Sequence, residues 1–287
     1  MTPERPAEQL RLSFARHPRS GTYLAGKRCE YPYLVTRAFR LDRAPADLLS
    51  VIVQSAGGAL LGGDHLRQAI DVGGGAAAHV TSQAALPVHR MKGDAEASES
   101  VTLRVGSGGW AEWLPSPRLL FPGARLRQSI DVELGDGGVL MLADGFAAVD
   151  PDGGGRRFDR YASDITVRDP QQRLLTADRL TIEGVDLDGT LIGGFAAHGV
   201  LLAMLPPARA ALDAIVESWN ERWMARSAAD GRGVGVYAGA SVLAHDLGIA
   251  VRVAARHGSA LRETLRGAWS DLRVALTGVA PGSRRIS

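Results

Sequence analysis

A strand-like heptapeptide occurs twice in this chain, and it constrains the fold more than any other feature. Leu66–Val72 reads Leu-Arg-Gln-Ala-Ile-Asp-Val, and Leu126–Val132 reads Leu-Arg-Gln-Ser-Ile-Asp-Val. A weaker copy, Val101–Val105, lies between them. In each copy apolar and polar residues alternate, which is the pattern of a β-strand with one buried face.

A glycine-rich turn comes at or shortly after the end of each copy, and a second strand follows each turn. The predicted turns are 73–75, 106–109 and 135–138, and the strands after them are Ala76–Thr81, Trp110–Leu114 and Val139–Ala143. Glycine tolerates the positive φ values that such turns need. A repeat of roughly 30 residues indicates stacked units that bury one another's faces. Two architectures fit this period equally well: a β-solenoid or helically wound sheet, and a run of hairpins in a large sandwich.

The β pattern continues to about residue 205 and then changes to helix. Tyr161–Val167 alternates, and further strand segments lie at 174–175 and 180–182. Beyond Pro206 and Pro207, which suit a helix start, apolar residues fall at helical spacing. They form two stripes, Leu212, Ile215, Val216, Trp219 and Trp223, then Leu261, Leu265, Ala268, Trp269, Leu272 and Leu276. For the second helix Ser259 is the expected N-cap and Gly278 the expected end.

We therefore predict one mostly β domain over residues 1–287. It has a repetitive β region at 10–205 and a helix-containing C-terminal region at 206–287 packed on it. The composition fits a globular protein, with 45% apolar residues, 22% charged residues and a net charge of +2, which gives no reason to expect nucleic-acid binding. A single cysteine excludes an intrachain disulfide. The N-terminus has no secretory pattern and no apolar run is long enough to span a bilayer, so we expect a cytoplasmic protein without a membrane partner.

Standard catalytic signatures are missing from the sequence, and we expect no enzymatic activity. There is no Gly-x-Ser-x-Gly elbow, no His-Glu-x-x-His pair and no phosphate-binding loop with its lysine. His65, His79 and His89 lie within one repeat and could converge when strands stack. Asp64 is the stronger candidate because Gly62 and Gly63 leave room beside it. It is either a turn aspartate that bonds its own backbone or a carboxylate that lines a narrow polar passage.

Several segments together resemble the urease accessory proteins called UreD, or UreH in some species. The matching pieces, in chain order, are 55–58, 63–66, 80–85, 112–115, 120–124, 177–180 and 268–273. The resemblance covers nearly the whole chain and favours the helically wound sheet. It implies a chaperone-like maturation factor that docks on apo-urease with a helical UreF-like accessory protein and a UreG-like GTPase. It also implies nickel in transit through an internal polar passage, with no tightly bound cofactor.

The resemblance also suggests roles for individual residues. Asp64, Asp144 and Asp178 stand where the family has acidic residues, and they are the candidate ligands for nickel in passage. Thr81 and Ser82 match a hydroxyl pair that would line the passage. Separately, two tryptophans one helical turn apart, Trp219 and Trp223, are the candidate partner interface, because aromatic residues are enriched at interface anchors.

Other segments depart from the family pattern and indicate a divergent branch. Ser116 and Pro117 follow Trp-Leu-Pro where many members have Gln-Glu, and Pro122 replaces an aspartate. Three other functions therefore stay open: a β-solenoid enzyme, a binding scaffold unrelated to urease, or a purely structural adaptor. An enzyme would show titratable groups clustered in a pocket, whereas a metal-transfer chaperone would show a conduit and broad exposed interfaces.

Overall fold

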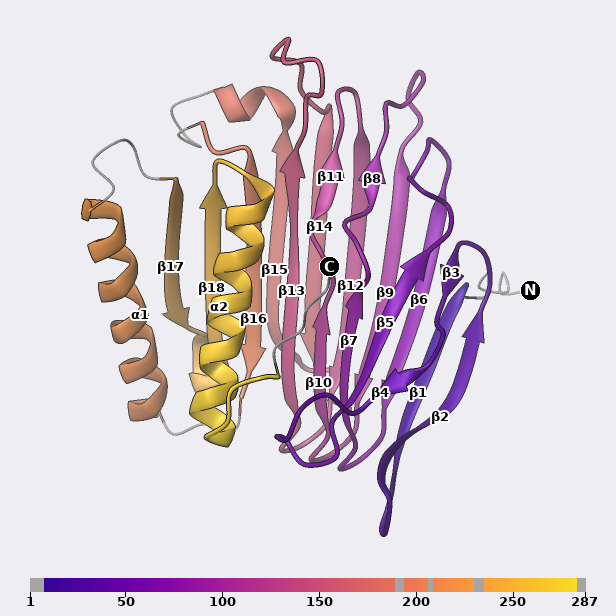
Figure 1. The fold of residues 1–287 in the computed structure, drawn as a ribbon, viewed down its shortest axis with the longest axis vertical. Helices are drawn as coiled ribbons and strands as arrows, with labels where there is room; N and C mark the ends of the chain where they lie inside the picture. Colours follow the sequence, from indigo (N-terminus) through magenta and orange to yellow (C-terminus); the bar gives the residue numbers. More distant parts are fainter. Residues whose placement is uncertain (1–7, 189–193, 206–208, 230–234, 283–287) are drawn as a thin grey trace.

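The computed structural model shows two β-sheets stacked face to face, with two helices on the outer face of the larger sheet (Figure 1). It describes residues 8–188, 194–205, 209–229 and 235–282. The proposed helix start at Pro206 and Pro207 and the first seven residues of the chain lie outside the described residues. Within them, no helix is both long and apolar enough to cross a membrane.

The smaller sheet has seven strands in the order β15-β14-β12-β9-β6-β1-β2. These are β1 (Leu10–His17), β2 (Gly21–Cys29), β6 (His65–Val72), β9 (Ala97–Val105), β12 (Arg125–Leu134), β14 (Arg160–Arg168) and β15 (Leu174–Glu183). From β1 to β14 every neighbouring pair is parallel. The outermost pairs, β1–β2 and β14–β15, are antiparallel.

The larger sheet follows the order β17-β18-β16-β13-β10-β7-β5-β3. Its strands are β3 (Tyr33–Leu34), β5 (Leu49–Ser55), β7 (Ala77–Ser82), β10 (Trp110–Leu114), β13 (Val139–Ala148), β16 (Ala197–Met204), β17 (Val236–Val242) and β18 (Gly248–Ala255). Three short strands also belong to it: β4 (Ala38–Phe39), β8 (Pro87–Val88) and β11 (Arg118–Leu120). Short 3₁₀ helices occupy η1 (Gly184–Asp188) and η2 (Ala244–Asp246).

The chain winds helically between the two sheets. It passes from β6 in the smaller sheet to β7 in the larger, then to β9, β10, β12 and β13 in alternation. Neighbours in each sheet are consequently parallel, as in β7–β10–β13. A run of hairpins would instead make them antiparallel. Of the two architectures that the repeat left open, the wound, solenoid-like arrangement favoured by the family resemblance is therefore confirmed, and all three copies of the repeat lie side by side in the smaller sheet.

The copies are offset in register. Leu66 aligns with Glu99, and Glu99 aligns with Gln128. The two heptapeptides are thus displaced by two residues relative to their sequence alignment. An even displacement keeps each side chain on its original face, so Gln68 and Gln128 both point into the space between the sheets, where both are buried.

The glycine turns stack directly on one another. A Cβ atom at Gly106 would lie 2.6 Å from the backbone nitrogen of Gly74, and one at Gly135 would lie 2.7 Å from that of Ser107. No side chain fits at such distances, so the close approach of successive coils requires glycine at both positions. This explains why a glycine-rich turn accompanies every repeat in the sequence.

Two apolar layers hold the structure together. One fills the space between the sheets. The other lies between the larger sheet and the helices α1 (Arg209–Ala229) and α2 (Gly258–Thr277). The end of α2 at Gly278 is confirmed, with φ of 72° at that residue, whereas its N-cap is His257 and not Ser259. Strands β17 and β18 were not foreseen; they come from the C-terminal region and extend the larger sheet.

The outer edge of β17 is covered by a side chain of α1. Asn220 donates a hydrogen bond to the carbonyl oxygen of Ala240 (3.0 Å) and accepts one from the amide of the same residue (2.8 Å). Both backbone groups of Ala240 are thereby occupied on the side away from β18, the other strand beside β17.

Candidate functional site

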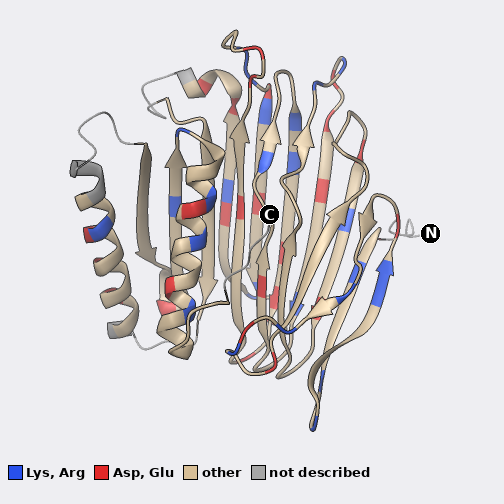
Figure 2. Cartoon of the chain, in the orientation of Figure 1, with Lys and Arg blue, Asp and Glu red and all other residues tan. Residues whose placement is uncertain are grey.

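A group of buried polar side chains interrupts the apolar layer between the sheets. Its members come from six strands: Gln68 (β6), Glu99 (β9), Arg118 (β11), Gln128 (β12), Asp144 (β13) and Ser163 (β14). Burying a polar group is costly unless it is hydrogen-bonded. Figure 2 shows charged residues within the strands as well as in the loops.

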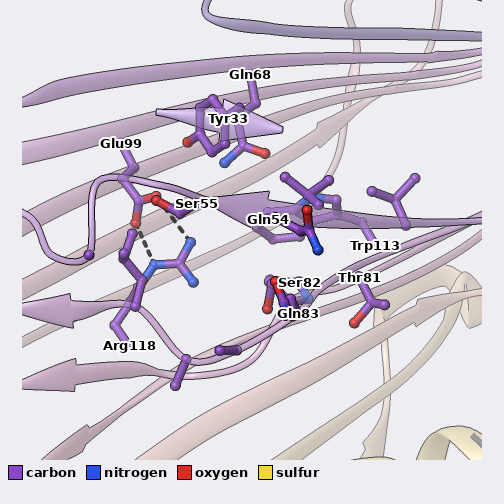
Figure 3. A pocket seen from close by; sticks show the side chains of 17 residues that line it. Tyr33, Gln54, Ser55, Gln68, Thr81, Ser82, Gln83, Glu99, Trp113 and Arg118 are labelled. Atoms are coloured by element: carbon purple, nitrogen blue, oxygen red, sulfur yellow. Dashed lines mark hydrogen bonds and ion pairs between the residues drawn. The ribbon is translucent and has the colours of Figure 1, made fainter. Parts of the chain in front are cut away.

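Glu99 and Arg118 form an ion pair at the wall of a first cavity of about 170 Å³ (Figure 3). Arg118 donates from Nε to Glu99 Oε2 (2.5 Å) and from Nη2 to Glu99 Oε1 (3.1 Å). Their side chains are 6% and 1% exposed. Burial alone would lower the pKa of the Arg118 guanidinium. The attraction of the Glu99 carboxylate and its hydrogen bonds are stronger than this effect, so the pKa is raised. The two hydrogen bonds fix both side chains in place.

Hydrogen bonds continue from this ion pair toward Asp144. The Gln128 amide nitrogen lies 3.4 Å from Glu99 Oε2, and Tyr161 donates its hydroxyl to Gln128 Oε1 (2.7 Å). The same tyrosine lies 2.8 Å from Asp144 Oδ2, which also accepts from Ser163 Oγ at 2.6 Å. The burial of Asp144 raises the pKa of its carboxyl, and the bonds from Ser163 and Tyr161 offset that rise only in part.

Asp144 also lines a second cavity, of about 420 Å³, between the ends of the two sheets. Other residues at this cavity include Ser163, Asp178, His198, Tyr237 and Arg252. Arg252 pairs with Asp178, so β18 of the larger sheet is tied to β15 of the smaller sheet. Burial lowers the pKa of His198, which favours its neutral form, and one ring nitrogen bonds the Phe195 carbonyl oxygen at 2.9 Å.

The buried polar groups therefore form a hydrogen-bonded chain that links the two cavities. Glu99 and Arg118 lie at one end, and Asp144 and Ser163 at the other. Among the described residues, no three His, Cys, Asp or Glu side chains are grouped closely enough to hold a metal ion. The arrangement offers isolated oxygen ligands near the two cavities and no multidentate metal site among the described residues.

The structure places the residues singled out in the sequence at different points. Asp144 and Asp178 line the same cavity. Thr81 and Ser82 line the first cavity, and both also line a groove on the outer side of the larger sheet. Their hydroxyls join the ends of β7 and β10: Thr81 donates to the Leu114 carbonyl oxygen (2.7 Å), and Ser82 accepts from the Ser116 amide (2.8 Å).

Asp64 occupies the turn before β6. Its carboxylate accepts a hydrogen bond from the amide of Leu61 at 2.7 Å, which is the turn role that the sequence left open beside the passage role. Asp64 is not among the residues that line the described cavities. Its participation in a passage stays a prediction.

The two tryptophans of α1 differ in exposure. Trp219 is 2% exposed and donates to Asp271 Oδ2 at 3.0 Å, whereas Trp223 is half-buried against the same layer. In this conformation only Trp223 presents surface to a partner, so the interface prediction now depends on that residue.

The three histidines that could have converged do not share a site. His65 lies beside Ser98, and His89 packs on Phe121. His79 is buried on the outer face of the larger sheet, the face that α2 covers, where its ring packs against Trp269. The repeat stacks these strands but does not bring the rings together.

Sequence analysis missed a second buried polar cluster, around Glu112 under α2. Its carboxylate contacts His79 Nδ1 (2.6 Å), Trp110 Nε1 (2.8 Å) and Arg273 Nη1 (2.7 and 3.0 Å). Burial alone would raise the pKa of Glu112, but the bond from His79 and the charge of Arg273 lower it to about 2. The signal that could have found it is a charged residue inside an apolar strand, Trp-Ala-Glu-Trp-Leu.

Comparison with known proteins identifies the family of this chain. The family model described as UreD urease accessory protein matches residues 7–287. The chain belongs to the UreD family. Relatives within it include urease accessory protein UreD 2 of Bradyrhizobium sp. (strain BTAi1), which is 38% identical over 91% of this chain and 86% of the relative. Another is urease accessory protein UreD 1 of Pseudomonas syringae pv. syringae (strain B728a), which is 32% identical over 98% of this chain and 97% of the relative.

Membership of the UreD family supports a role in urease maturation. The relatives are named as accessory proteins and not as enzymes. The resemblance that the sequence suggested is therefore confirmed. The resemblance also implies that nickel passes through the protein and that the protein docks on partners. These finer implications remain proposals.

Proposed function

We propose that this protein assists urease maturation by passing Ni²⁺ through the space between its two sheets to apo-urease. The observation that carries the proposal is the chain of buried polar groups that joins the two cavities. A purely structural core has little use for such a chain, because an apolar layer of similar volume stabilises a fold at least as well. Carboxylate, hydroxyl and amide oxygens can instead replace part of the water around a divalent cation.

Asp144 is the central ligand in this proposal. Glu99 and Asp178, the carboxylates on either side of it, are each neutralised by an arginine. Asp144 has no ion pair of its own among the described residues: it accepts hydrogen bonds from the Ser163 hydroxyl and the Gly145 amide, lies beside the Tyr161 hydroxyl, and feels Arg118 only through the longer-range attraction of its charge. A carboxylate without a cationic partner in a buried site gains most from an incoming cation, because the cation removes the cost of its desolvated charge.

Transfer also requires partners at the two ends of the path. The family resemblance supports docking on apo-urease in a complex with a helical UreF-like protein and a UreG-like GTPase, with nickel in transit and no tightly bound cofactor. In this proposal the protein acts as a chaperone and not as an enzyme. Single oxygen ligands hold Ni²⁺ weakly, so each step of the transfer is readily reversible.

Asp144→Asn tests the proposal, because it removes the charge and nearly preserves the shape. In cells that co-express urease and its accessory proteins at limiting nickel, we expect the nickel content and activity of urease to fall by about tenfold. Asp169→Asn is the matched control. Asp169 is also a buried carboxylate, but it bonds Arg173 in the turn between β14 and β15. Full activation by the folded Asp144→Asn variant would refute nickel passage past this residue.

A further inference from the structure

The ion pair of Arg252 and Asp178 differs from the ion pair deeper in the molecule. Glu99 and Arg118 are both almost completely buried. At the second cavity, the Asp178 side chain is only 9% exposed, but the Arg252 side chain is 61% exposed. The carboxylate belongs to the interior, and its partner reaches it from the solvent side.

Arg252 also has room to move. It stands near the middle of β18, and its neighbour across the β17–β18 ladder is Gly239. The space where a Cβ atom of Gly239 would lie is open, with no other atom within 4 Å. The exposed guanidinium regains its hydration when it leaves the pair, so the cost of separation falls mainly on the desolvated Asp178 carboxylate, and an incoming cation would offset that cost.

The pairing changes the charge at the cavity. With Arg252 in place, its positive charge neutralises the negative charge of Asp178. Its guanidinium also occupies the position that a metal ion bound to Asp178 would take. Without it, a carboxylate that is largely shielded from water faces a cavity that also contains Asp144 and Ser163. Such a carboxylate attracts a divalent cation strongly.

We propose that Arg252 is a removable plug: its guanidinium occupies the cation position on Asp178 and keeps this end of the path closed to metal ions from solution. This inference rests on the proposed function and specifies how the same path is controlled. The apolar run Gly-Ile-Ala-Val-Arg-Val-Ala-Ala of β18 supports it, since a lone arginine there has no role in packing the strand. The protein alone is closed, and displacement of Arg252 opens it.

Binding of NiCl₂ to the isolated protein, followed by isothermal titration calorimetry, tests the plug. Arg252→Ala is expected to bind Ni²⁺ about tenfold more tightly than the wild type, because a positive charge beside the site is removed. In an Asp178→Asn background the same substitution should have no effect. Arg179→Ala is the matched control, because Arg179 is the next residue along β15 and pairs with Asp164 as an exposed ion pair (3.3 Å; 77% and 46% exposed).

Two results would overturn the plug. One is equal Ni²⁺ affinity of Arg252→Ala and wild type in folded protein, and the other is an equal gain in the Asp178→Asn background. The urease activation assay separates this failure from that of the proposed function. If Arg252→Ala gains no affinity while Asp144→Asn still lowers urease activation, the path stands without a plug. If neither substitution has its effect, both proposals fail.

Discussion

The buried pair of Glu99 and Arg118 gives the sharpest prediction about stability. Arg118→Met keeps most of the side-chain volume and leaves the Glu99 carboxylate, which is 1% exposed, without its cation. Removing one partner of a buried ion pair costs about 3–5 kcal/mol, because the remaining charge is desolvated and unpaired. Glu99→Gln should cost a similar amount, since it leaves a buried guanidinium.

The double variant Glu99→Gln/Arg118→Met decides whether charge is the cause. It removes both charges, so it should recover most of the loss and unfold within about 1–2 kcal/mol of the wild type. Unfolding in urea, followed by tryptophan fluorescence, is a suitable assay because Trp113 lines the same cavity. Arg104→Met is the control, on the same strand as Glu99: Arg104 pairs with Asp71 at 3.1 Å near the surface, with side chains 50% and 28% exposed, and its loss should cost about 1 kcal/mol or less. Two results would refute the reasoning. One is a loss of less than 1 kcal/mol in the free energy of unfolding for either single variant, and the other is a loss in the double variant equal to the sum of the two single losses.

Two further predictions concern the carboxylates of Glu112 and Asp64. The bond from His79 and the charge of Arg273 lower the pKa of Glu112 to about 2, well below the ordinary value of a glutamate. Its ionised form therefore stabilises the fold above about pH 4.5, and that contribution, roughly 3 kcal/mol, is lost as the pH falls toward 2. Glu112→Gln should therefore flatten the dependence of the thermal midpoint on pH between 2.5 and 5. Glu263→Gln, on the exposed face of α2, is the control and should keep the wild-type slope. Equal slopes for the two variants would contradict the stabilising role of the ionised Glu112. Asp64→Asn retains an oxygen that can accept the Leu61 amide and should leave the urea midpoint nearly unchanged, whereas Asp64→Leu loses that bond and should cost about 1 kcal/mol. Reduced urease activation by a fully stable Asp64→Asn at limiting nickel would show instead that Asp64 acts in the passage.

Local patterns in the sequence predict the wound sheet, because the residues that define it are near one another. The heptapeptide copies, the glycine turns and the strands after them each depend on alternation or on backbone freedom within about ten residues. The two-residue register offset was not predictable, since the displacement keeps every side chain on its own face. Strand β17 was missed because Ala-Gly-Ala-Ser in its middle has little β-forming pattern.

The polar groups at the two cavities, by contrast, come from residues that are distant in sequence. Nineteen positions separate Glu99 from Arg118, and 74 separate Asp178 from Arg252. No local period links such pairs, and only the stacking of the two sheets brings them together. The family resemblance did select Asp144 and Asp178, which the fold places on one cavity, but it gave no indication of the arginines beside them.

The amide of Asn220 has a consequence for how the molecule behaves at high concentration. A protein built by adding coils has no inherent last coil, and the exposed rim of its final strand is a template on which another molecule can add. At β17 that template is interrupted in the middle, where α1 supplies a side-chain amide in place of a neighbouring backbone. At Ala240 the edge of β17 therefore offers no free backbone groups to another molecule, and a strand that added there would have to displace the Asn220 amide first.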